Sequence, residues 1–181
     1  MLKQLLSGIS LYLFHWNPTS ARNYFPVHSV YKVKIIKGRP MLDKTNPEID
    51  AINQTIEDSI KWPFPEKNPA RLEGALAHDD NFFIFHPDSK STVIGYDSFK
   101  KTIDNVFMDP ELKPQITDIS EMRINISQSG DVAWYSCMLD DVGEYNGKKW
   151  EWLGCRWTGV LEKRDSRWLI VQMHFSLPSD K

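Results

Sequence analysis

Two side chains near the C-terminus have the types best suited to chemistry on a small molecule. Arg156 lies in the segment C-R-W-T-G-V-L, and His174 lies in V-Q-M-H-F-S. A guanidinium beside an imidazole can hold a carboxylate or an enolate, with the histidine as acid or base. We therefore predict His174 and Arg156 as the catalytic pair. The alternative is that they only form hydrogen bonds within a sheet or across a dimer.

Other candidates would line a pocket around this pair. Asp141 alone could act as a base, whereas Asp140 points to the opposite face of the same strand and cannot pair with it. His86 ends a short apolar segment before a proline, which suits the mouth of a pocket. Large rings suit pocket walls, although core packing is the alternative for each. The predicted ligand-binding residues are Trp62, His86, Tyr96, Tyr135 and Trp152.

The sequence favours neither a metal site nor a cofactor. Four ligand-type side chains occur close together, but their spacing is not a recognised metal pattern, and helix-end and turn chemistry explains the first three. They are His78, Asp79, Asp80 and His86. Two cysteines, Cys137 and Cys155, are too few for a disulfide framework or a four-thiolate zinc site. We expect both to remain free thiols, because the predicted strand register would place them on opposite faces of a sheet.

The first part of the chain predicts three helices and a small hairpin. Asn46-Pro47-Glu48 is typical of a helix start, and isoleucines at helical spacing continue it to Trp62. Asn68-Pro69 predicts a second, shorter helix. Strands are predicted over 81–86 and 92–94, and a third helix from Gly95 to Asp109-Pro110.

After Pro114 the apolar period changes from helical to two. Four strands are predicted, over 115–127, 131–145, 148–163 and 167–177. Ser129-Gly130 and Asn146-Gly147 are tight-turn dipeptides, and the second is a strong hairpin signal. Helices followed by a long meander indicate an α+β fold rather than an alternating α/β fold.

The turns predict which residues face each other. A two-residue turn at Asn146-Gly147 predicts three pairs on the central hairpin: Cys137 with Arg156, Tyr135 with Thr158, and Asp141 with Trp152. A three-residue turn at 164–166 would set Arg156 opposite His174 and Thr158 opposite Gln172, and a two-residue turn would shift these pairs by one. The first set would form one mixed polar and aromatic face that suits a pocket. An apolar face would then pack on the helices or on a second subunit.

Several segments in order resemble the SnoaL-like branch of the nuclear-transport-factor-2-like superfamily. They run from about Asn46 to Pro178 and include F-F-I-F, S-G-D-V-A-W, R-W-T-G-V-L and W-L-I-V-Q-M-H-F-S. The last is also similar to the association domain of calcium/calmodulin-dependent kinases. The resemblance implies a cystatin-like cone, in which three N-terminal helices pack on a curved antiparallel sheet.

The resemblance implies a small-molecule-binding domain that forms a homodimer through the sheet. The ligand would be a small organic molecule, which could be anionic, and an enzyme would perform proton-transfer chemistry such as isomerisation or hydration. Isomerase and cyclase relatives use a pocket carboxylate as base, and no segment here matches that motif. The alternative is a non-catalytic domain for dimerisation or protein interaction.

Composition limits the partners and the domain organisation. A chain of 181 residues with net charge −2 has room for one domain and carries no basic field for nucleic acid or anionic membrane. We assign residues 43–178 to the cone and predict a cytoplasmic protein. Residues 1–42 contain no acid. They would be a targeting segment, a structured extension, or residues upstream of a start at Met41.

Overall fold

The computed structural model describes residues 46–87 and 92–179. The predictions for residues 1–42 therefore lie outside the described residues. The first elements are α1 (Pro47–Lys61), α2 (Pro69–Ala75), β1 (Phe83–Phe85), β2 (Val93–Ile94), α3 (Tyr96–Thr102) and the π-helix η2 (Ile103–Phe107). Four long strands follow: β3 (Leu112–Ile126), β4 (Val132–Tyr145), β5 (Lys148–Arg164) and β6 (Arg167–Ser176).

Local sequence signals explain where α1 begins and how it is fixed to the sheet. The Asn46 side chain accepts a hydrogen bond from the Glu48 N–H at 3.0 Å, as expected of a helix N-cap. Ile52 and Ile56 on the predicted apolar stripe are fully buried. Glu48 also accepts hydrogen bonds from Lys163 and from the Trp168 indole, both at 2.7 Å. The first turn of α1 is thereby attached to the β5–β6 hairpin.

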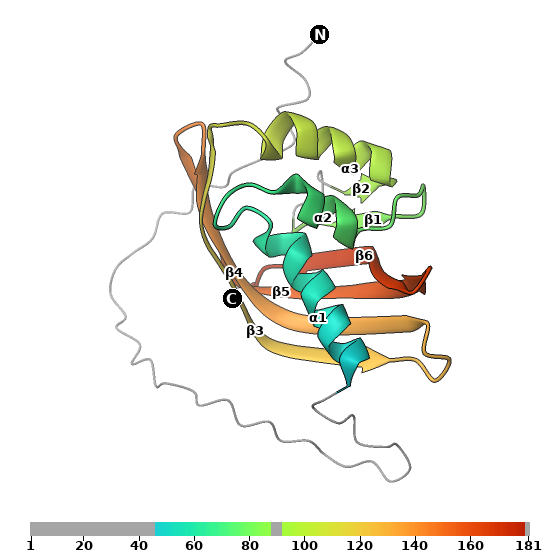
Figure 1. The fold of residues 1–181 in the computed structure, drawn as a ribbon. Coiled ribbons are helices and arrows are strands. Elements are labelled where there is room, and N and C mark those ends of the chain that lie inside the picture. The colour runs from blue at the N-terminus through green and yellow to red at the C-terminus, as the bar shows by residue number, and fades with distance from the viewer. Residues whose placement is uncertain (1–45, 88–91, 180–181) are drawn as a thin grey trace, which may run out of the picture.

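The six strands form one curved sheet in the order β2-β1-β6-β5-β4-β3. All neighbours are antiparallel except β1 and β6, which are parallel. The helices lie on one side of this sheet (Figure 1). We call that side the inner face and the opposite side the outer face. The α+β prediction is confirmed, with a sheet that curves around the helices without closing into a barrel.

The central hairpin confirms the predicted register near its turn but not beyond a bulge. Asp141 pairs with Trp152, as predicted. On the far side of the bulge Cys137 pairs with Trp157, and Tyr135 pairs with Gly159, so the pairs predicted there are wrong by one residue. The extra residue is on β5, where Gly154 adopts φ +63° and its N–H donates to Asp140 at 2.6 Å.

The last hairpin also differs from the prediction. Its loop has two residues, Asp165 and Ser166, both with positive φ, rather than three. A second bulge near Val160 adds another residue on β6. Arg156 consequently pairs with Ser176, and Thr158 pairs with His174, so the predicted pairing of Arg156 with His174 is wrong.

The two bulges redistribute the residues between the faces. A one-residue insertion exchanges the faces of every side chain beyond it. Cys137 and Cys155 are both buried and, by the alternation of the strands, both belong to the inner face rather than to opposite faces. They are free thiols, as predicted, but not because the sheet separates them. Arg156 and His174 are exposed and lie on the outer face.

Candidate functional site

A continuous row of aromatic rings follows the inner face across three strands. His86, just beyond β1, stacks on Phe175 of β6 with ring centroids 5.8 Å apart. Phe175 stacks on Trp157 of β5 at 5.4 Å, and Trp157 meets the ring of Tyr135 edge-on at 5.1 Å. Trp152 adds a further ring, 5.6 Å from Phe175. The curved sheet therefore carries an aromatic wall on its inner face.

Two polar atoms in this row have no hydrogen-bond partner among the described residues. They are the Tyr135 hydroxyl and the Trp157 indole N–H. Tyr135 is only 2% exposed and Trp157 is fully buried. Burial raises the pKa of Tyr135, so its phenol remains protonated. Unpaired buried polar groups cost stability, and both groups could donate to a polar atom inside the cone.

Asp141 is a carboxylic acid on the inner face, directly opposite Trp152. It accepts a hydrogen bond from the Thr117 hydroxyl at 2.8 Å and one from the Trp150 indole at 3.1 Å. Burial raises the pKa of Asp141, and the two donors oppose that rise. A carboxyl in this environment is suited to proton transfer because its charged form is not strongly favoured.

An open pocket of about 570 Å³ is connected to this carboxyl through one of its wall residues. It lies between the α1–α2 connection and β3, and Thr117 belongs both to its wall and to the hydrogen bonds of Asp141. The Arg71 side chain helps to shape it, since it pairs with Asp58 at 2.7 Å and donates to the carbonyl of Phe64 at 3.1 Å. The lining residues are Lys61, Phe64, Pro65, Arg71, Gln115 and Thr117.

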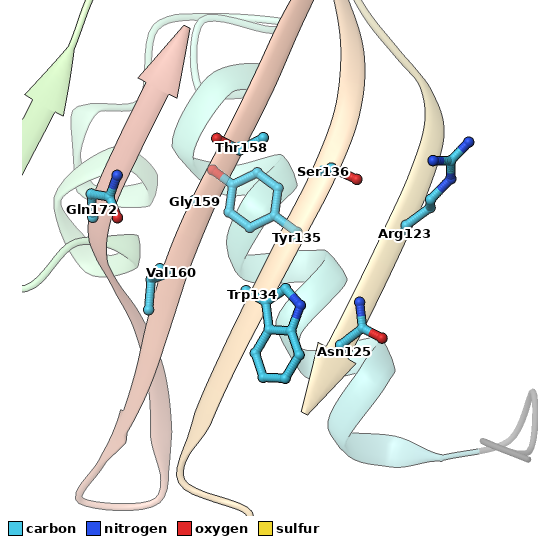
Figure 2. A pocket seen from close by; sticks show the side chains of 9 residues that line it. All are labelled: Arg123, Asn125, Trp134, Tyr135, Ser136, Thr158, Gly159, Val160 and Gln172. Atoms are coloured by element: carbon cyan, nitrogen blue, oxygen red, sulfur yellow. The ribbon is translucent and has the colours of Figure 1, made fainter. Parts of the chain in front are cut away.

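A second cavity, of about 350 Å³, lies on the sheet (Figure 2). Its side chains come from β3, β4, β5 and β6, and Trp134, at 43% exposure, forms one wall. The polar lining residues on the outer face are Arg123, Asn125, Ser136, Thr158 and Gln172. Tyr135 and Gly159 also contribute to the lining, and Figure 2 shows the Tyr135 ring beside Gly159.

The structure brings three of the predicted ligand-binding residues together and separates the others. His86, Tyr135 and Trp152 all belong to the inner aromatic wall. Trp62 instead stacks on a phenylalanine of η2 at 5.5 Å, and Tyr96 stacks on His78 at 3.7 Å. These two rings pack among the helices and their neighbours.

The predicted catalytic residues lie on the other side of the sheet from this wall. Arg156 and His174 share the outer face as diagonal neighbours, not as a directly facing pair. The roles of Thr117 and Trp150 next to Asp141 were not predicted from the sequence. Trp150 alternates with Trp152, so the correct register near the turn already placed it on the face of Asp141. No comparable signal pointed to Thr117, because no turn residues predicted how β3 pairs with β4.

The described residues contain no group of three or more side chains suited to hold a metal ion. Within the same residues no helix is both long and apolar enough to cross a membrane.

Comparison with solved structures identifies the class of fold. A provisionally named scytalone dehydratase from Novosphingobium aromaticivorans matches with TM-score 0.58 and 14% identity, over 74% of this chain and 85% of that one. A nuclear-transport-factor-2-like protein from Cytophaga hutchinsonii matches with TM-score 0.54 and 18% identity, over 76% and 100%. The kinase hub homology domain of Chlamydomonas reinhardtii matches with TM-score 0.51 and 20% identity, over 74% and 97%. Similarity at these identities shows a shared nuclear-transport-factor-2-like fold.

The sequence itself identifies the family within that class. The family described as the SnoaL-like domain matches residues 52–180, and the chain belongs to it. A sequence comparison with curated proteins gives no match. The family, and an α+β fold with a curved sheet, both inferred from short sequence segments, are thereby confirmed.

Proposed function

We propose that the protein binds a small organic molecule at the cavity between the α1–α2 connection and β3, with Asp141 as its acid–base group. The observation that carries this proposal is the hydrogen bond from Thr117, a residue of the cavity wall, to the partly buried carboxyl of Asp141. A cavity beside a titratable group of perturbed pKa is a typical ligand site. The enzymatic form of this function is proton transfer, such as isomerisation or loss or gain of water.

The choice between the two cavities depends on chemistry. Neither cavity has a carboxyl among its lining residues, but a wall residue of the first, Thr117, is hydrogen-bonded to the partly buried carboxyl of Asp141. The inner site combines Asp141 with aromatic surface that could hold an unsaturated or ring-containing ligand. One relative is provisionally named a dehydratase, and removal of water belongs to the same class of chemistry.

The experiment compares wild type with Asp141→Asn. Native mass spectrometry of the purified protein identifies any small molecule that co-purifies, and thermal shifts with hydroxylated and carbonyl-containing ring compounds identify binders. We expect the variant to keep the fold and to lose at least tenfold in affinity or turnover. Asp97→Asn, the same change at an exposed helix position, is the matched control. Equal ligand shifts for wild type and Asp141→Asn would refute the role of Asp141.

The catalytic role of His174 and Arg156 stays a prediction, as does the cytoplasmic location. Both side chains are exposed on the outer face, so they would act on a ligand bound there rather than inside the cone. Replacement of His174 by alanine separates the two sites. Loss of ligand binding in His174→Ala with normal binding in Asp141→Asn would move the functional site to the outer face.

We propose a second function, homodimerisation through the outer face, on a separate observation. Large apolar side chains are exposed on this face, where helices do not cover it (Figure 1). They are Phe85, Ile94, Ile116, Trp134 and Leu153. Extended apolar exposure of this kind is typical of an interaction surface. Sedimentation equilibrium measures the association, and Leu153→Glu should weaken it if the outer face is the contact.

A further inference from the structure

The outer face carries two acids directly opposite each other. Asp118 of β3 pairs in register with Asp140 of β4. Asp140 is half-buried and accepts a hydrogen bond from the Gly154 N–H, whereas Asp118 is exposed. Like charges that face each other across two strands are destabilising. Among the described residues no cation forms an ion pair with either aspartate.

A cation without an ion-pair partner lies on the other side of β4. Arg156 of β5 is opposite Met138, which is in turn opposite Ser120 of β3. The Arg156 side chain is exposed and forms no ion pair with another described residue. The outer face therefore has an acidic pair on β3 and β4 and a guanidinium on β5, displaced from the pair by two residues along the strands.

This arrangement is complementary to itself. In a two-fold dimer, every contact from one residue of the first copy to another residue of the second copy occurs twice, the second time with the two copies exchanged. A two-fold axis close to Met138, between the two sheets and oblique to β4, would set the acidic pair of each copy against Arg156 of the other. Opposite charges would then meet twice, and each would relieve the repulsion between one pair of aspartates.

We propose that a second copy of this chain docks on the outer face with Arg156 of each copy held by the Asp118–Asp140 pair of the other. The proposal rests on homodimerisation through the outer face and adds its orientation and its charge contacts. Arginine suits the role because its planar fork can bond two carboxylate groups at once. The acidic pair thus selects the orientation of the partner, and the apolar side chains supply most of the contact.

The outer face is of the size that such a dimer needs. Four strands spaced by about 4.8 Å, each with at least ten residues rising about 3.3 Å, cover roughly 600 Å² in outline. Side-chain relief increases the accessible area towards the ~800 Å² per partner of a standard interface. Trp134 and Leu153, both exposed, lie on the same face as Arg156 and can exclude water around the charge contacts.

The test is a charge exchange measured by sedimentation equilibrium of the full chain at low salt. Arg156→Glu and Asp118→Lys should each raise the dimer dissociation constant at least 100-fold, since each change affects two symmetric contacts by at least tenfold. The double variant with both changes restores the opposite charges and should return to within about tenfold of wild type. Lys101→Glu, the same reversal of charge at an exposed position of α3 on the helical side of the sheet, is the matched control and should leave the constant unchanged.

The results of this test distinguish the charge contacts from the association itself. A wild-type chain that stays monomeric at all concentrations would refute both. A dimer that is lost in Leu153→Glu but unaffected by Arg156→Glu would keep the outer-face contact and refute the charge contacts. Equal weakening in the single and double variants would also refute the pairing. Arg156→Gln removes the charge of the arginine without reversing it. Circular dichroism and tryptophan fluorescence of every variant show whether the fold is kept, which separates loss of the contact from loss of the fold.

Discussion

The substitution of Gly159 by alanine gives the sharpest test of how the inner face is arranged. A Cβ atom at this position would lie 2.6 Å from the backbone oxygen of Gln172 and 2.5 Å from Cε1 of Tyr135. The Tyr135 ring thus occupies the space that a side chain at 159 would need. This close approach exists only because the bulge at Gly154 sets Tyr135, rather than Trp134, opposite Gly159.

The size of the effect follows from these two distances. Carbon atoms attract at about 3.5–4.0 Å, so the new methyl group would have to move about 0.9 Å away from the Gln172 oxygen. The oxygen belongs to the backbone of β6 and cannot rotate away. Overpacking of a core costs about 1–3 kcal/mol, and we expect a loss near the upper value. For a domain of this size that loss lowers the melting temperature by about 10 °C.

Gly74→Ala is the matched control for this measurement. Gly74 is an exposed residue of α2, and no other atom lies within 4 Å of a Cβ built there. Alanine is preferred over glycine in helices, so the control should gain up to about 1 kcal/mol. Calorimetry or circular dichroism of both variants gives the melting temperatures. If Gly159→Ala melts at the same temperature as wild type, Tyr135 does not lie over Gly159 and the pairing of β4 with β5 beyond the bulge is wrong.

Three further measurements test other contacts. The raised pKa of Asp141 means that its ionised form is disfavoured in the fold. The free energy of unfolding of wild type, relative to that of Asp141→Asn, should therefore fall as pH rises from about 4 to 7. Urea unfolding measures this difference, and a rise over the same range would contradict the burial of the carboxyl. Burial raises the pKa of Cys137 to about 12 and that of Cys155 to about 11. Both thiols should therefore react with a disulfide reagent only after denaturation. A disulfide mapped between Cys137 and Cys155 would contradict this expectation. Hydrogen bonding to Arg164 lowers the pKa of Asp79, so Arg164→Ala should cost about 0.5–1 kcal/mol at pH 7. This difference should shrink as the pH falls below about 4, and a constant difference would contradict the pairing.

Local signals in the sequence determined the elements and the family. The Asn46 cap, the isoleucine stripe of α1 and the Asn146-Gly147 turn depend on contacts between residues close in the chain, and all three are present as predicted. The register next to that turn, including Asp141 opposite Trp152, was also determined, because two residues fix the pairing of the strands they join. The strand boundaries differ from the prediction by at most three residues.

The faces of the sheet were decided by the tertiary structure. A bulge inserts one residue where strands pack over a curved core, and each insertion exchanges the inner and outer sides for the rest of the strand. Gly154 marks one bulge, but a glycine in a strand does not by itself indicate an extra residue. This is why Tyr135 and Cys137 were assigned to the face of Arg156, and why Trp157 and Phe175 were not expected in the aromatic wall.

The candidate site depends on the same long-range contacts. The sequence supplies Asp141, Thr117 and the tryptophans, and it determines that β4 and β5 form a hairpin. Only the pairing of β3 with β4 brings Thr117, 24 residues away, to the carboxyl of Asp141. Only the folded sheet withdraws that carboxyl partly from water. Burial and a partner on another strand are what change the pKa of a carboxyl, and both are properties of the folded chain rather than of any segment.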